Sequence, residues 1–140
     1  MASVIYNAAK KAIADGVINF DTDALKVMLV TSTYVPDIDL HDFRDDVTNE
    51  VVGTGYVAGG KSLANNVTAQ DNANDRATVD GDDIQWAAST ITAAGAVIYK
   101  DVGSAATDPV IGYLDFGGDI VSVNGNFDIN WNAIGFLTMT

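Results

Sequence analysis

Eight consecutive residues, Gly55–Ser62, fit the phosphate-binding pattern G-x-x-x-x-G-K-[ST] without a mismatch. That pattern holds nucleotide phosphates where a buried parallel strand leads into a helix whose N-terminus faces the anion. The residues that follow, Leu63–Thr68, favour a helix poorly, and no apolar strand ends in an Asp suited to magnesium. We therefore interpret the segment as a glycine-rich turn between two strands and expect no nucleotide site.

Clustered aspartates suggest a second chemistry, because calcium takes about 6–8 oxygen ligands and Asp-rich loops supply them. The candidate sets are Asp21 and Asp23; Asp37, Asp39 and Asp42; and Asp71, Asp75, Asp80, Asp82 and Asp83. None fits the EF-hand pattern, since Ala73 stands where the third-position ligand of a loop starting at Asp71 belongs. Asp also closes turns by bonding nearby backbone N–H groups, so we assign no metal ligand and keep calcium as an alternative.

Catalytic residues are harder to find. The sole histidine, His41, lies in a polar stretch near Arg44, and no G-x-S-x-G elbow accompanies it. We expect His41 to pack or hydrogen-bond within its own loop. A pair of Asp carboxylates also serves glycosidases, but a small chain with 18 Asp has such pairs everywhere. We therefore predict that the chain is not an enzyme and has no catalytic residues.

Six aromatic residues are candidates for a sugar-binding groove: Tyr34, Tyr56, Tyr99, Tyr113, Trp86 and Trp131. The two tryptophans lie on apolar faces of expected strands, which favours packing in the core. Carbohydrate binding stays open as a minor alternative.

Composition limits the function further. Seven Lys and Arg stand against 19 acidic residues, for a net charge of −12. Such acidity argues against nucleic-acid binding, which needs clustered Lys and Arg. With no Cys and a single His, the chain lacks disulfides, thiolate metal sites and a multi-histidine zinc site, and we expect no cofactor. No basic segment followed by an apolar one opens the chain, and no apolar run reaches about 18 residues, so we expect no secretion signal and no membrane partner.

All but one of the acids are Asp, which suits turns better than helix interiors, and many short strands are broken by turn residues. We therefore predict a mainly β fold: one β-rich domain spanning 1–140, an antiparallel β-sandwich or small barrel. A short N-terminal helix is expected within 1–16, from Ser3 as its cap to Asp15, with Gly16 ending it.

The expected strands follow the helix in order. They are 25–31, 51–58, 61–67, 77–79, 84–86, 91–100, 110–116 and 126–132. Between the first two lies a polar loop, 32–49, with a helical turn around 40–44. Two hairpin turns are expected, at Asp80-Gly81 and at Asn124-Gly125, the second placing Ile120 opposite Ile129.

Several segments, in a fixed order along nearly the whole chain, resemble a family of small structural proteins of tailed bacteriophage virions. They are 12–23, 25–31, 41–50, 53–60, 96–101, 115–117 and 125–127. The resemblance implies a capsid decoration (cement) protein that binds over junctions of the major capsid protein lattice and stabilises the head. It brings no catalytic residues.

Charge favours the outer capsid surface, because an acidic domain facing packaged DNA is repelled. We expect Met1–Asp15 and the 32–49 loop to reach the shell or a sister subunit, and the chain to be a homo-oligomer made in the host cytoplasm. The alternatives are a tail, collar or fibre-associated component that binds glycans or calcium, and a free calcium- or sugar-binding module.

Overall fold

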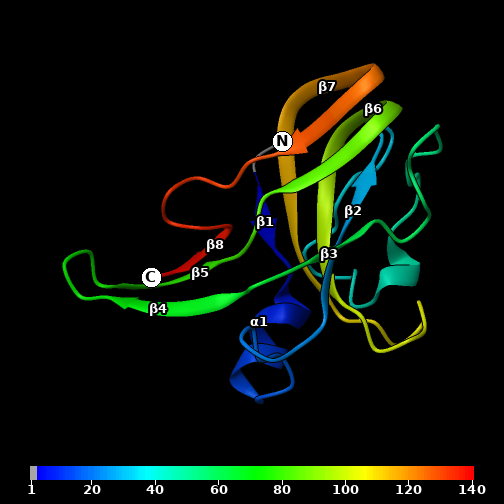
Figure 1. The fold of residues 1–140 in the computed structure, drawn as a ribbon. Helices are drawn as coiled ribbons and strands as arrows, with labels where there is room; N and C mark the ends of the chain where they lie inside the picture. The colour runs from blue at the N-terminus through cyan, green and yellow to red at the C-terminus, as the bar shows by residue number, and fades with distance from the viewer. Residues whose placement is uncertain (1–2) are drawn as a thin grey trace.

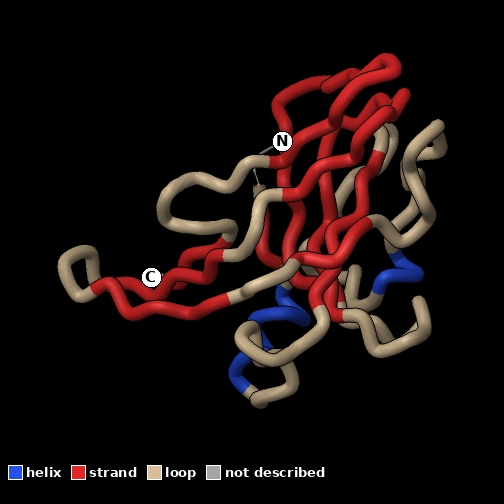
Figure 2. Tube along the Cα trace, in the orientation of Figure 1, coloured by secondary structure: helices blue, strands red, loops and turns tan. Residues whose placement is uncertain are grey.

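The computed structural model describes residues 3–140, which form one short helix, a single 3₁₀ turn and eight strands (Figures 1 and 2). In chain order these are β1 (Val4–Ile5), α1 (Asn7–Ala14), β2 (Leu25–Val30), η1 (Arg44–Asp46), β3 (Lys61–Leu63), β4 (Val67–Asp71), β5 (Arg76–Asp80), β6 (Ile84–Lys100), β7 (Val110–Ile129) and β8 (Leu137–Met139). The strands make two antiparallel sheets, ordered β1-β7-β6-β2-β3 and β4-β5-β8. The mainly β prediction with one N-terminal helix is confirmed, and within 3–140 the sheets do not close into a barrel.

Two long strands organise the fold. β6 and β7 pair along most of their length and bend together, so that each runs up one side of the molecule and down the other (Figure 1). The two halves of β7 therefore face each other, and the rings of Phe116 and Phe127 lie 6.2 Å apart. The core fills the space between these halves, with Trp86 packed edge-on against Phe127 at 6.0 Å.

Irregular pairing produces the bend. Ala93 pairs with Ile120 and Gly95 with Asp115, so Ala94 alone lies opposite four residues, 116–119. Among these four residues, Gly117 and Gly118 take φ values of 78° and 150°, which glycine adopts at little cost. Extra residues in one strand of a pair increase its bend and twist.

The second half of β6 is the central strand of the larger sheet. All residues from Ala93 to Tyr99 are buried, as expected of a strand covered on both faces. The 32–49 loop packs on one of these faces, where Arg44 lies 5.1 Å from the ring centroid of Tyr99 and Tyr34 packs edge-on against Tyr113.

The expected hairpin turn at Asn124-Gly125 is wrong. Both residues lie inside β7, Ile129 pairs with Ile84, and Ile120 pairs with Ala93. Asn124 does take a positive φ of 46°, but it does so in a β-bulge. A type I′ turn needs a positive φ at both residues, and here only Asn124 has one, so its positive φ marks a bulge and not a reversal of the chain.

The expected hairpin at Asp80-Gly81 is also wrong. Strands do flank it, but β5 and β6 belong to different sheets. Val79 of β5 pairs with Thr68 of β4 and Leu137 of β8. Figure 1 shows the three-stranded sheet projecting to one side of the bent pair.

At the N-terminus the helix is shorter than expected, because Val4 and Ile5 pair with β7 as β1. Ser3 does not cap the helix; its hydroxyl accepts a hydrogen bond from the backbone N–H of Asp115 at 3.0 Å. The two β-branched residues gain more from extending the sheet than from a helix turn.

Two expected strands between residues 51 and 67 are mostly loop. Thr54 forms an isolated bridge with Thr90, β3 ends at Leu63, and Asn65 takes a φ of 54°. The helical turn expected at 40–44 lies slightly later, as η1. The strands expected at 25–31, 91–100 and 110–116 are present, the last two as parts of longer strands.

Candidate interaction surface

Helix α1 and the 32–49 loop, predicted separately as contact segments, are joined in the fold. The backbone N–H of Asn7 donates to the carbonyl of Ile38 at 3.0 Å. The Asn7 side chain donates to Asp39 Oδ1 at 2.7 Å. These residues are distant in sequence, so the hydrogen bonds turn two segments into a single surface, which we call the α1/loop surface (residues 7–17 and 32–49).

A chain of buried and half-buried hydrogen bonds supports this surface from below. The hydroxyls of Tyr6 and Tyr34 are 2.6 Å apart, and the Tyr34 hydroxyl lies 2.9 Å from His41 Nδ1. The backbone N–H of Asp37 also donates to His41 Nδ1, so that nitrogen is an acceptor and Tyr34 donates to it. Burial raises the pKa of Tyr6 well above its usual value, which keeps the hydroxyl protonated and able to donate.

His41 is therefore a structural residue of its loop, as expected from the sequence. Its ring stacks on Tyr34 at 5.7 Å, and its Nδ1 is occupied by loop donors. A catalytic triad needs a nucleophile and a carboxylate on opposite sides of the imidazole, and the described contacts of His41 supply neither.

A buried ion pair fastens the far end of the loop. Arg44 Nε donates to Asp108 Oδ2 at 2.8 Å, and Asp108 is fully buried. The other carboxylate oxygen accepts the N–H of Val102 at 2.7 Å and of Ser104 at 3.3 Å. Because these donors satisfy both oxygens, the charge is tolerated in the interior and fixes 44–46 against the 101–108 loop.

The outer side of the α1/loop surface is apolar at several points. Leu40 is 73 % exposed and Val35 64 %, and Phe43 of the same loop and Val17 after α1 are partly exposed. A hollow of about 220 Å³ separates α1 from Phe43 and Pro109. These exposed apolar side chains are available for contact with another protein.

The aspartates predicted as possible calcium ligands are spread over turns and ion pairs. Asp21 accepts from Thr68, and Asp37 accepts the N–H groups of Asp39 and Leu40. Asp71 pairs with Arg76 at 2.8 Å. Among residues 3–140, no three acidic or histidine side chains gather closely enough to hold a metal ion. Turn formation, the simpler interpretation, explains Asp37, whereas Asp21 binds a distant strand and Asp71 forms an ion pair.

The match of residues 55–62 to the phosphate-binding pattern has a structural explanation. A strand, β3, begins at Lys61 within them, where a phosphate site requires a helix. A Cβ on Gly60 would lie 1.8 Å from the carbonyl oxygen of Val27, so only glycine fits against β2. The Lys61 ammonium donates to the carbonyl of Gln85 at 2.5 Å and lies 6.0 Å from the Trp86 ring centroid. The Lys61 side chain thus binds the edge of β6.

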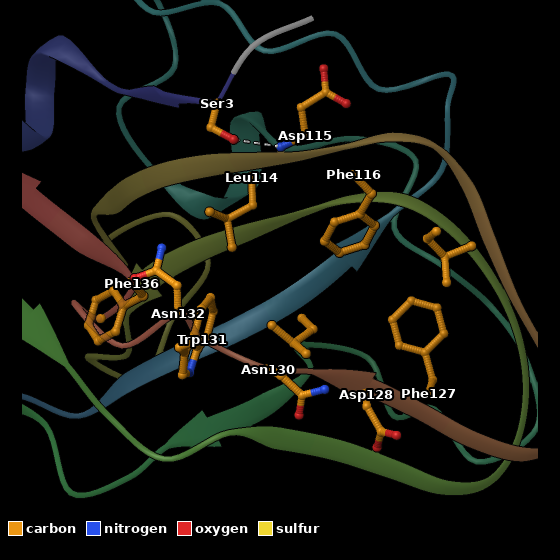
Figure 3. Close-up of a pocket in the computed structure, with 13 residues that line it drawn as sticks. Ser3, Leu114, Asp115, Phe116, Phe127, Asp128, Asn130, Trp131, Asn132 and Phe136 are labelled. Carbon is orange, nitrogen blue, oxygen red and sulfur yellow. Dashed lines mark hydrogen bonds between the residues drawn. The ribbon is translucent and has the colours of Figure 1, made fainter.

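A second and larger hollow, of about 390 Å³, lies between the two halves of β7 (Figure 3). Leu114 and Phe116 face it from the first half, Phe127 faces it from the second, and Trp131 faces it from the segment just after β7. The Trp131 indole N–H donates to the carbonyl of Asp82 at 2.9 Å, which fixes one edge of the ring that lines the hollow.

The prediction of core packing is confirmed for Trp86 and only in part for Trp131. Trp86 is buried in the core, as expected, whereas Trp131 lies beyond the end of β7 and is only half-buried. Tyr34, Tyr99 and Tyr113 are buried and do not form an exposed groove.

No family model, curated protein or solved structure matches the chain. In residues 3–140, no helix is long and apolar enough to cross a membrane.

Proposed function

We propose that this chain is a non-enzymatic structural protein of a tailed bacteriophage virion. In this role it decorates the outer surface of the capsid, binds the major capsid protein and stabilises the head. Two lines of reasoning support the proposal: the sequence resemblance, which spans nearly the whole chain, and the α1/loop surface.

The observation that carries the capsid contact is the rigidity of that surface. Exposed Leu40 and Phe43 belong to a loop anchored by Tyr6–Tyr34–His41 at one end and Arg44–Asp108 at the other. A surface that is already ordered loses little conformational entropy when it binds, which favours a docking role. Repeated over a lattice, modest contacts add up through multivalency.

Charge supports the outer side of the shell. At a net charge of −12, a chain inside the head would be repelled by packaged DNA, whereas outside it remains soluble before assembly. The runner-up is a tail, collar or fibre-associated component, and the hollow lined by Trp131 is the feature that favours it, because aromatic faces stack on sugars.

Particle occupancy of surface variants tests the proposal. The double variant Leu40→Asp/Phe43→Asp places charge on the α1/loop surface, and Val52→Asp, at a residue that is 97 % exposed in another loop, is its control. We expect the control to reach wild-type copy number on purified virions and the double variant to lose most of its occupancy. Equal occupancy of all three proteins contradicts a contact through this surface, and no occupancy by the wild type contradicts the virion role.

A further inference from the structure

Exposed strand edges carry unpaired backbone groups, and proteins that stay monomeric usually protect them. This chain protects most of its edges. On β4, the backbone N–H and the hydroxyl of Thr68 both donate to the Asp21 carboxylate, at 2.6 and 2.9 Å. Strands β1, β3 and β8 are only two or three residues long.

The first half of β6 is protected as well. Its edge away from β7 is covered at two points, by the Lys61 ammonium of β3 on the carbonyl of Gln85 and by the bridge between Thr54 and Thr90. The bent pair of strands is therefore closed on its β6 side.

The β7 side is open. β1 pairs with β7 only at Gly112 and Tyr113, and within the described chain no strand pairs with Ile120–Phe127 on the side away from β6. Ile120, Val121 and Val123 are 47, 58 and 70 % exposed on this stretch. It contains neither Lys nor Pro, the residues that commonly discourage edge pairing. We call Ile120–Val123 the open edge.

Charge is distributed so that a second copy can approach here. The chain carries −12, yet Ile120–Phe127 contains no charged residue. The neighbouring stretch of β6 has none from Trp86 to Tyr99, and the 51–60 loop that bridges to it has none either. Two acidic copies therefore meet least repulsion at this end of the molecule.

We infer that the open edge pairs with the open edge of a second copy of this chain, antiparallel across a two-fold axis. An antiparallel two-fold contact is self-complementary, since each copy offers the same surface. With Ser122 of one copy opposite Ser122 of the other, Val121 meets Val123 and Ile120 meets Asn124, as the two-fold axis and the alternation of side chains require. Apolar residues face each other in this register, and no two acids are opposed.

The pairing is short because the bulge at Asn124 ends the regular stretch. It is smaller than a standard stable interface, so the dimer is in dynamic exchange with the monomer and dissociates on dilution. This inference does not depend on the capsid role, because it concerns the isolated chain.

Sedimentation equilibrium over a dilution series, from micromolar to millimolar chain, tests it. We expect the wild type to approach twice the monomer mass at the concentrated end, and added salt to strengthen association by screening the net charge. Val121→Asp/Val123→Asp should abolish the dimer. The charge-matched control Val52→Asp/Val57→Asp, in the exposed 51–60 loop, should leave a dimer with at most a several-fold weaker association, from its added charge.

Hydrogen exchange of the wild type provides a readout that needs no variant. Amides of the open edge that point away from β6 should gain protection as concentration rises, while other exposed amides should not change. A chain that stays monomeric throughout the series overturns the inference. So does a dimer that both double variants weaken equally, or one whose concentration-dependent protection lies elsewhere.

Discussion

Gly60 illustrates how one residue can satisfy a motif for unrelated reasons. Its φ is 77°, and its Cα faces the backbone of β2 so closely that no side chain fits. Lys61, next to it, bonds the β6 backbone. Gly60 and Lys61 thus match the phosphate-loop pattern for reasons of packing. Gly60 allows a close approach to the backbone of β2, and Lys61 covers the edge of β6.

Gly16 offers a matched comparison for this claim, since its φ is 73° but no atom lies within 4 Å of where its Cβ would be. Gly16→Ala should lower the free energy of unfolding by about 1 kcal/mol, from the backbone conformation alone. Gly60→Ala has the same conformational cost and adds a clash with Val27. It should therefore lower the free energy of unfolding by at least about 2 kcal/mol more than Gly16→Ala does.

Urea denaturation of both variants measures the difference. Equal losses would show that β2 does not constrain Gly60. A rise in melting temperature of the wild type with ATP and magnesium, abolished by Lys61→Ala, would instead restore the nucleotide interpretation.

The Arg44–Asp108 pair gives a second prediction at this scale. Arg44→Met leaves the fully buried Asp108 without its cationic partner and should lower the free energy of unfolding by about 3 kcal/mol. Arg76→Met is the control, because Arg76 is similarly exposed but its partner Asp71 is partly in solvent. Its loss should stay below about 1 kcal/mol. Similar losses in the two variants, measured by chemical denaturation, would mean that Asp108 is stabilised by its backbone donors alone.

At the level of elements, sequence pattern was sufficient where a strand is buried on both faces. The apolar runs of β2 and of the second half of β6 have little alternative to a central strand. Pattern failed where a strand continues through a bulge. Asn124 and Gly125 have turn chemistry, and no local signal distinguishes a bulge in a 20-residue strand from a reversal.

The contact surface shows the same limit. Both of its segments are predicted from the sequence, but the hydrogen bond between Asn7 and Asp39 that joins them is not. Its two residues are 32 positions apart, so the bond depends on the completed fold. The open edge is not predicted for a related reason. The sequence predicts two strands with a hairpin between them where the fold has the single strand β7, and a hairpin pairs the residues that are in fact exposed.

Asn124 also provides the prediction for this scale. Asn124→Val places a β-branched residue at a φ of 46° and should lower the free energy of unfolding by about 1–2 kcal/mol. Asn126→Val, two residues later and exposed in the same strand, should have little effect or stabilise slightly. If thermal unfolding finds the two variants equally stable, the bulge at Asn124 is not a constraint on β7.

For the molecule as a whole, the five tyrosines link stability to pH. Burial raises the pKa of Tyr99 to about 12, and raises those of Tyr6, Tyr34, Tyr56 and Tyr113 as well. Because the folded-state pKa lies above the unfolded value of 10.0, the contribution to stability is complete below pH 10. It is lost as pH rises from there through 12.

Alkaline unfolding should therefore be cooperative and should coincide with the appearance of tyrosinate absorbance. Circular dichroism and ultraviolet absorbance, recorded on the same titration, measure the two events. The urea-unfolded chain is the control and should titrate near pH 10. Tyrosinate formation near pH 10 with the β signal intact would contradict the burial of these side chains.

The copy number of the chain in purified virions, relative to the major capsid protein, tests the proposed role most directly. Quantitative mass spectrometry of the particles gives this ratio. A decoration protein spread over the shell should be present in hundreds of copies, at a simple ratio to the capsid protein. A few copies to a few tens would contradict capsid decoration and move the chain to the tail, collar or fibres, and absence from the particle would contradict a virion role altogether.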